Sequence, residues 1–261
     1  MHKTYILFCI SFISILQAQS PIIIAHRGAS AYAPENTLEA FEKAITMGAN
    51  CIETDVHQTK DGEVVIMHDF SVQRTTNGKG LIKNLSLEKF KSLNIKYRKK
   101  ILETNPPTLE EAIQLINGRC NLIIELKKGN SYYPGIESKI ISLIKKYQAE
   151  TWISAIHSFE KEALINITKN DSHIKLQKLI VFNLPLVSFS FDKQFSKDDF
   201  SNWQGVNVNH LFCSKRLIKQ LHGLNKTVFA WTVNSPRKAK RLAKRGVDGI
   251  ITNKPDILTK K

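Results

Sequence analysis

The stretch NLIIEL, Asn121–Leu126, is strongly apolar and predicts a strand. On its N-terminal side, Pro107 precedes a predicted helix over residues 108–116. On its C-terminal side, residues 134–147 carry Ile and Leu at helical spacing and predict a second helix. A strand that lies between two helices is the repeating unit of a parallel sheet covered by helices.

The same alternation continues toward both ends of the chain. Toward the N-terminus, strands are predicted at IIIAH (Ile22–His26) and CIETDV (residues 51–56). Asn36 is predicted to cap the helix between them, with Glu39 completing a capping box and Gly48 ending the helix. Toward the C-terminus, the predicted strands are TWISAIH, LQKLIVF, GVNVNH, TVFAWTV and DGIIT, with helices over residues 161–168, 214–222 and 235–245 between several of them.

These candidates amount to about eight strands that alternate with helices along the chain. For a chain of 261 residues, we expect one α/β domain that closes as a (β/α)8 TIM barrel rather than a doubly wound open sheet. No linker rich in Pro, Gly or Ser divides the sequence, so this domain is predicted to occupy residues 21–261.

Two stretches interrupt the alternating pattern. Residues 70–106 are interpreted as a small insertion that follows the second barrel strand. Residues 182–204 contain the apolar segment LPLVSFSF, which is interpreted as local packing over the barrel mouth. A loop that faces lipid or substrate is the alternative interpretation of this second stretch.

Residues 1–19 resemble a secretory signal peptide. The chain begins with the basic segment MHK, residues 5–16 are apolar apart from two serines, and small and polar residues precede Pro21. The apolar run is short for a membrane span, and no later run is long enough. We therefore expect an exported protein, periplasmic or secreted, that is cleaved near Ala18 or Gln19 and is not stably inserted in a membrane.

The formal net charge of +15 suits a protein that meets anionic partners. Nucleic-acid-binding proteins are basic because they neutralise phosphates, but the sequence has no aromatic and basic signature of RNA recognition. We therefore expect a small anionic phosphoester as the partner, and no nucleic acid. Peripheral contact with lipid stays open, and the sequence does not indicate an oligomeric state.

Polar and ionisable residues gather where the predicted strands end. In a β/α barrel, functional groups lie at the carboxyl ends of the strands. Residues two apart on a strand point to the same face, so pairs with this spacing can share a site. The strand-end residues are His26, Glu53, Asp55, His68, Glu125, Lys127 and Trp231.

Three of these residues predict a metal site. Carboxylates that converge in one pocket repel one another, and at least one would stay protonated unless a cation intervened. Oxygen ligands alone favour a hard cation. We therefore expect one divalent cation, Ca²⁺ or Mg²⁺, held by Glu53, Asp55 and Glu125.

The other strand-end groups suit acid–base chemistry on a phosphoryl group. His26 and His68 are candidates for general acid and base, because imidazole titrates near neutral pH. Arg27 and Lys127 are suited to the negative oxygens of a phosphoryl group. The remaining histidines are interpreted as structural, and His157 is the one among them whose assignment is most open: His57, His157, His173, His210 and His222.

Seven segments contain these residues in a fixed order. They are HRGAS-x-x-APENT (26–37), IETDV with DGEVVIMHD (52–69), RTTNGKG (74–80), IELK (124–127), HSF (157–159), WTVN (231–234) and GVDGIITNKP (246–255). In this order they resemble the motifs of the glycerophosphodiester phosphodiesterase family. The resemblance covers essentially the whole chain after the N-terminal segment, and seven motifs in order are far more specific than HRG alone.

The resemblance implies a β/α barrel that hydrolyses glycerophosphodiesters to sn-glycerol 3-phosphate and an alcohol. It further implies the metal, acid–base and phosphate-binding assignments given above, with Trp231 lining the glycerol side of the pocket. Residues 70–106 would be the family's small insertion. The alternative function is a phospholipase D-like hydrolysis of lysophospholipids at the same site. A silent phosphodiester-binding module is disfavoured because no acid, base or metal ligand is missing.

Overall fold

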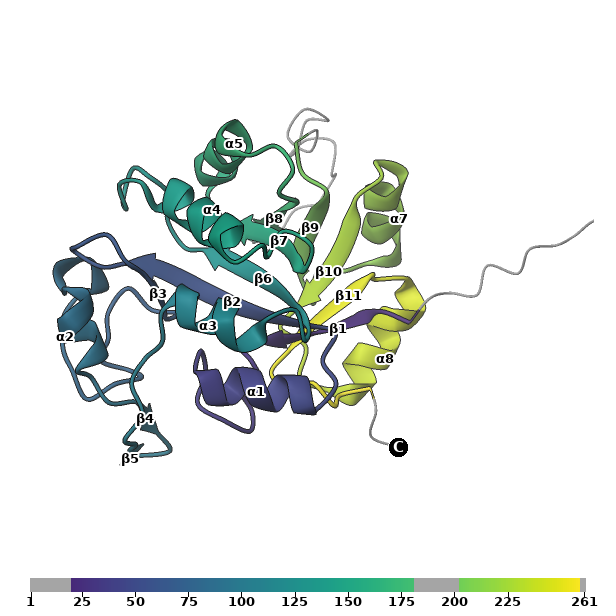
Figure 1. Cartoon of the computed structure of the whole chain (residues 1–261). Helices are drawn as coiled ribbons and strands as arrows, with labels where there is room; N and C mark the ends of the chain where they lie inside the picture. The colour runs from purple at the N-terminus through teal and green to yellow at the C-terminus, as the bar shows by residue number, and fades with distance from the viewer. Residues whose placement is uncertain (1–19, 181–201, 259–261) are drawn as a thin grey trace, which may run out of the picture.

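The computed structural model describes residues 20–180 and 202–258. The predicted signal peptide and the segment LPLVSFSF lie outside the described residues. Eight parallel strands close into a barrel, and helices lie between them around its outside, as Figure 1 shows. The predicted (β/α)8 barrel is therefore confirmed. The barrel strands are β1 (Ile22–His26), β2 (Cys51–Gln58), β6 (Asn121–Leu126), β7 (Ile153–Ser158), β8 (Leu176–Ile180), β9 (Gly205–Asn209), β10 (Thr227–Trp231) and β11 (Gly249–Thr252).

The helices on the outside of the barrel bury their apolar faces against the sheet. They are α1 (Leu38–Thr46), α3 (Leu109–Ile116), α4 (Ile136–Lys146), α5 (Lys161–Asn170), α7 (Lys215–Gly223) and α8 (Pro236–Arg245). The side chain of Thr108 caps α3, and Glu111 completes a capping box there. Among the described residues, no helix combines the length and apolar character needed to cross a bilayer.

The barrel interior is apolar at one end and polar at the other. Six residues from six strands form an apolar layer inside the barrel below the polar groups: Ile24, Cys51, Ile123, Ala155, Phe229 and Ile251. Above that layer, the interior carries buried polar side chains, among them Glu53, Glu125 and His157. The apolar layer supplies packing, so the polar layer at the carboxyl ends is free to carry chemistry.

Strand register places the polar residues beside one another. His26 of β1 is the Cα partner of Glu53 on β2. Asp55, two residues further along β2, is the partner of Glu125 on β6, and Glu125 is in turn the partner of His157 on β7. Neighbours in register on parallel strands point to the same face, so these groups converge inside the barrel.

The segment between β2 and α3 forms a small subdomain at the side of the barrel. It begins with β3 (Val64–Ile66), which pairs antiparallel with the end of β2. It has an apolar cluster of its own, formed by Val65, Met67, Val72, Ile82, Phe90 and Leu93. Its other elements are the 3-10 turn η1 (Ile82–Asn84), the short helix α2 (Leu87–Lys91) and the hairpin of β4 (Lys96–Tyr97) and β5 (Lys100–Ile101).

The start of α1 differs from the prediction by one residue. Thr37 is the N-cap, and its side chain accepts a hydrogen bond from the amide of Ala40. Asn36 has a positive φ of 56° and its side chain points into the barrel, where Nδ2 donates to Asp55 Oδ2 at 2.7 Å. The prediction that Asn36 caps this helix was therefore wrong. Asn and Thr both cap helices well, but the side-chain amide of Asn36 is hydrogen-bonded to the buried carboxylate of Asp55 instead.

The turn after β1 requires a glycine. Gly28 has a φ of +77°, and a Cβ built on it would lie 2.7–2.8 Å from the backbone and Cβ of Ala40 in α1. This close approach brings the first turn of α1 against the end of β1. It thereby fixes the loop that carries His26 and Arg27.

We expect Gly28→Ala to lower the free energy of unfolding by about 3 kcal/mol, because backbone strain and a clash with Ala40 act together. Gly48→Ala is the matched control, since Gly48 has a φ of +75° but open space where a Cβ would lie. It should cost only about 1 kcal/mol. Urea denaturation of both variants measures the difference, and equal losses would contradict the steric argument.

Candidate active site

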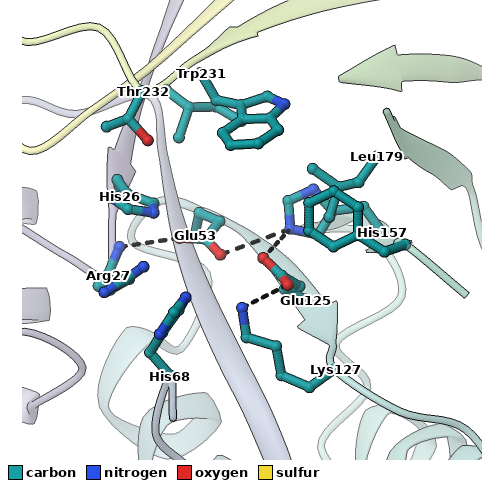
Figure 2. Close-up of a pocket in the computed structure, with 12 residues that line it drawn as sticks. His26, Arg27, Glu53, His68, Glu125, Lys127, His157, Leu179, Trp231 and Thr232 are labelled. Carbon is teal, nitrogen blue, oxygen red and sulfur yellow. Dashed lines mark hydrogen bonds and ion pairs between the residues drawn. The ribbon is translucent and has the colours of Figure 1, made fainter. Parts of the chain in front are cut away.

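A pocket of about 430 Å³, which includes space open to solvent, lies at the carboxyl ends of the barrel strands (Figure 2). Seven of the eight residues predicted for the site line it. They are His26, Arg27, Glu53, His68, Glu125, Lys127 and Trp231. Asp55, the eighth, is fully buried and contacts Arg27 and Lys127. The structure therefore brings together residues that the sequence separates by more than 200 positions.

Three buried carboxylates form the floor of the site, and two cations balance them. Lys127 Nζ lies 2.6 Å from Asp55 Oδ1 and 2.5 Å from Glu125 Oε1. Arg27 Nε lies 3.3 Å from Asp55 Oδ2, and the Arg27 amide donates to Glu53 Oε2 at 3.0 Å. The cluster therefore holds one more carboxylate than it holds cationic side chains from Arg27 and Lys127.

This imbalance divides the carboxylates by their pKa values. Burial would raise the pKa of Asp55, but the charges of Lys127 and Arg27 outweigh it and hold that pKa below its ordinary value. Burial and the charge of Asp55 raise the pKa of Glu125 to about 7. The Glu125 carboxyl is thus partly protonated near neutral pH unless a further cation binds, which is the direction expected from the sequence.

The donor set fits a divalent cation. Glu53 Oε1 is buried and has no hydrogen-bond partner among the described residues. Glu53, Glu125 and His157 each offer a ligand atom, and these atoms lie within 4.8 Å of one another. Carboxylate oxygens that are buried, converging and incompletely paired are what a hard cation needs.

His157 is a member of the site that the sequence interpretation left as structural. It is buried, and its Nε2 lies 3.6 Å from Glu53 Oε1 and 4.0 Å from Glu125 Oε2. The amide of Asn207 donates to His157 Nδ1 at 2.6 Å, so the proton of the neutral ring lies on Nε2 and faces the two carboxylates. At these distances Nε2 makes no hydrogen bond to either carboxylate, so the ring lies beside Glu53 and Glu125 without pairing with them. The sequence feature that could have indicated its place in the site is its position at the end of a predicted strand.

The two histidines at the mouth are also held through Nδ1, but there Nδ1 donates to an oxygen. His26 Nδ1 is hydrogen-bonded to Asn253 Oδ1 at 2.7 Å, and His68 Nδ1 to Asp69 Oδ1 at 2.7 Å. With Nδ1 engaged, each ring has Nε2 left for proton transfer in the pocket (Figure 2). Burial, together with the charges of Lys127 and Arg27, lowers the pKa of His68, so its neutral form predominates at pH 7.

A chain of ion pairs links the histidine supports to the carboxylate floor. Arg74, from the insertion, contacts Asp69 Oδ2 with Nε at 2.5 Å and Glu35 Oε2 with Nη1 at 2.8 Å. Glu35 Oε1 in turn accepts from Arg27 Nη1 at 2.8 Å. Sequence interpretation assigned no role to Glu35, Asp69 or Arg74, although each lies in a quoted motif.

One wall of the pocket is apolar and opposes the charged floor. The rings of Phe159 and Trp231 meet edge to face, with centroids 5.8 Å apart, and Leu179 and Ile251 extend the wall. Trp231 Nε1 is buried without a hydrogen-bond partner among the described residues. The pocket can therefore hold a ligand that has an anionic centre beside Arg27 and a less polar part beside the rings.

Comparisons with known proteins agree on one family. The family described as "Glycerophosphoryl diester phosphodiesterase family" matches residues 26–257. The chain belongs to this family. It is therefore a phosphoric diester hydrolase that acts on glycerophosphodiesters.

Individual relatives span the same length. A glycerophosphodiester phosphodiesterase from Caldanaerobacter subterraneus is 38% identical over 243 residues, which are 91% of this chain and 96% of that protein. One from Bacillus altitudinis is 34% identical over 90% of this chain and 95% of its own length. Among solved structures, an Oleispira antarctica phosphodiesterase in complex with the product sn-glycerol-3-phosphate is 26% identical with a TM-score of 0.78, covering 92% of this chain and 96% of that one.

We expect Arg74→Gln to raise the pKa of Asp69 from about 2 toward its ordinary value, because burial raises that pKa and the hydrogen bond from Arg74 is the largest opposing effect. The folded-state pKa lies below the unfolded one. The pair therefore stabilises the fold above pH about 4, and this contribution disappears as the pH falls toward 2. NMR titration of the Asp69 carboxyl carbon measures the shift. Arg119→Gln, which removes the exposed pair with Glu42, should leave the titration of Asp69 unchanged.

Proposed function

We propose that this hydrolase converts glycerophosphodiesters to sn-glycerol 3-phosphate and an alcohol, using His26 and His68 as general acid and base. One observation carries the proposal: two histidines with anchored Nδ1 atoms line the same pocket as Arg27 and the buried carboxylates. The product bound to the Oleispira antarctica phosphodiesterase, sn-glycerol-3-phosphate, supports the same substrate class.

We further propose that Glu53, Asp55 and Glu125 hold one divalent cation, Ca²⁺ or Mg²⁺. Asp55 and Glu125 are partners in strand register, and Glu53 lies two residues from Asp55 on the same face. A ring nitrogen that carries a proton cannot bind a cation, so His157 is expected to support the site and the three carboxylates to be the ligands. When bound, such a cation supplies positive charge that stabilises the phosphoryl oxygens during reaction.

The proposed reaction begins with the glycerol 2-hydroxyl of the substrate. His68 Nε2 takes the hydroxyl proton, the oxygen forms a bond to phosphorus, and the bond from phosphorus to the alcohol oxygen breaks. His26 gives its proton to the departing alcohol. Water then adds to the cyclic phosphate and opens it to sn-glycerol 3-phosphate, with the histidines exchanging roles.

The surroundings of the two rings support this division of roles. Asp69 beside His68 Nδ1 stabilises the imidazolium that forms when His68 accepts a proton. His26 Nδ1, in contrast, faces the neutral side chain of Asn253 and has no carboxylate in that position. The asymmetry favours His68 as base and His26 as acid.

The remaining residues bind and orient the substrate. We propose that Arg27 and Lys127 bind the phosphoryl oxygens, since each already lies against a carboxylate of the floor and faces the pocket. Trp231 would contact the glycerol part through its ring, next to Phe159. Donors fixed before substrate arrives need no reorganisation as negative charge develops.

We expect His68→Ala and His26→Ala each to lower kcat for glycerophosphocholine about a hundredfold or more. A phosphodiester of glycerol and p-nitrophenol distinguishes the general acid from the general base, because p-nitrophenol departs with little need for protonation. His26→Ala should regain most of its rate on it, whereas His68→Ala should not. His173→Ala, an exposed ring away from the pocket, is the control. Unchanged turnover of His68→Ala would remove His68 from the scheme.

We expect chelation with EDTA to abolish release of glycerol 3-phosphate, and added Ca²⁺ or Mg²⁺ to restore it. Calorimetric titration of the metal-free protein separates the ligands without an activity readout. Asp55→Asn should weaken cation binding about tenfold to a hundredfold, and His157→Ala should weaken it less. The opposite order would replace Asp55 by His157 in the ligand set.

A further inference from the structure

Positive charge is concentrated in one part of the chain. Residues 201–247 contain ten Lys and Arg residues and no Asp or Glu, and Asp248 is the first acidic residue after them. This segment is less than a fifth of the sequence and carries ten of the fifteen net positive charges. It spans β9 to the end of α8 and includes both α7 and α8.

The two helices turn these cations to solvent. On α8, the exposed basic residues follow the spacing i, i+3, i+4 and i+7, which places them on one face: Arg237, Lys240, Arg241 and Lys244. On α7, Lys215, Arg216 and Lys219 are exposed, while Leu217, Ile218 and Leu221 are buried against the barrel. Each helix therefore presents an apolar inner face and a basic outer face.

The cations of this segment have no acidic partners. Within residues 20–180 and 202–258, none of the ten makes an ion pair. The lysines of α4 behave differently: Lys139, Lys145 and Lys146 each pair with a carboxylate. Like charges one helical turn apart, such as Lys240 and Lys244, destabilise α8. No acidic side chain within the described residues offsets this repulsion.

The two helices and the loop between β9 and α7 form one surface, which we name the α7–α8 face. Lys238 Nζ of α8 lies 3.3 Å from His210 Nε2 of that loop, and Arg245 Nη1 donates to the carbonyl of Cys213 at 2.9 Å. Leu211 in the same loop is 71% exposed, more than any other large apolar side chain of the described residues. In Figure 1, α7 lies beside β10, and α8 lies beside β1 and β11.

We propose that the α7–α8 face docks onto the surface of an anionic lipid bilayer. Its cations are spread along two helices instead of converging on one point, which suits a flat anionic surface rather than a single small anion. Leu211 supplies an apolar side chain that can enter the interface between headgroups and acyl chains. No described residue of the face is an exposed Phe, Tyr or Trp on which a nucleic-acid base could stack.

Docking by this face would set the orientation of the barrel. The loop that carries Leu211 follows β9 at its carboxyl end, which is also the end at which the pocket opens. The His210 amide donates to the carbonyl of Trp231, a residue of the pocket wall, at 2.8 Å. The pocket mouth would therefore lie beside the bilayer. The docking does not depend on the proposed reaction.

The test is co-sedimentation of the full chain with vesicles of phosphatidylglycerol and phosphatidylcholine, compared with vesicles of phosphatidylcholine alone. The triple variant Lys240→Gln, Arg241→Gln, Lys244→Gln removes three charges from the face and leaves the pocket intact. Each basic side chain near an anionic surface contributes about a factor of five. The partition coefficient should therefore fall on the order of a hundredfold, with hydrolysis of a soluble diester unchanged.

The matched control is Lys139→Gln, Lys145→Gln, Lys146→Gln, which removes the same charge from α4 on the opposite side of the barrel. It should keep most of the vesicle binding. Equal losses in both variants, equal binding to both kinds of vesicle, or tighter binding to duplex DNA than to anionic vesicles would each overturn the proposal. If the α8 variant does not fold, Lys215→Gln, Arg216→Gln, Lys219→Gln on α7 gives the same test.

Discussion

The structure depends on the burial of three carboxylates inside one barrel. Glu53, Asp55 and Glu125 are 7% exposed or less, and charged groups at such depth are stable only with counter-charges in contact. Arg27 and Lys127 supply two of these charges. Arg27 and Lys127 leave the third carboxylate without a counter-charge. The pKa of Glu125 is therefore raised, and a metal ion suits the site.

Closure of the barrel makes this concentration of charge possible. Parallel strands in register bring His26, Asp55 and Glu125 to one end, while a layer of apolar side chains fills the other. The apolar layer and the surrounding helices supply the packing that offsets the cost of the polar end. The glycine turn after β1 then fixes the loop from which Arg27 reaches both Glu53 and Asp55.

Much of this arrangement could be predicted from the sequence, because the signals are local. Alternating apolar strands and amphipathic helices predicted the barrel, and spacing of two residues predicted that Glu53 and Asp55 share a face. The supporting residues could not be predicted in this way. Arg74 contacts both Asp69 and Glu35 only because the insertion folds back over the loop after β1. A single strand-end histidine such as His157 is ambiguous until its neighbours in register are known.

The subdomain between β2 and α3, which contains the insertion, has its own apolar cluster, separate from the cluster that holds the barrel together. Regions with small, separate cores open with lower free energies than the whole fold. Arg74 and Asp69, which fix the ring of His68, belong to this segment. On the proposed mechanism, heat or a protease that loosens this segment inactivates the enzyme while the barrel stays native. Thermal inactivation is then expected at a lower temperature than global melting.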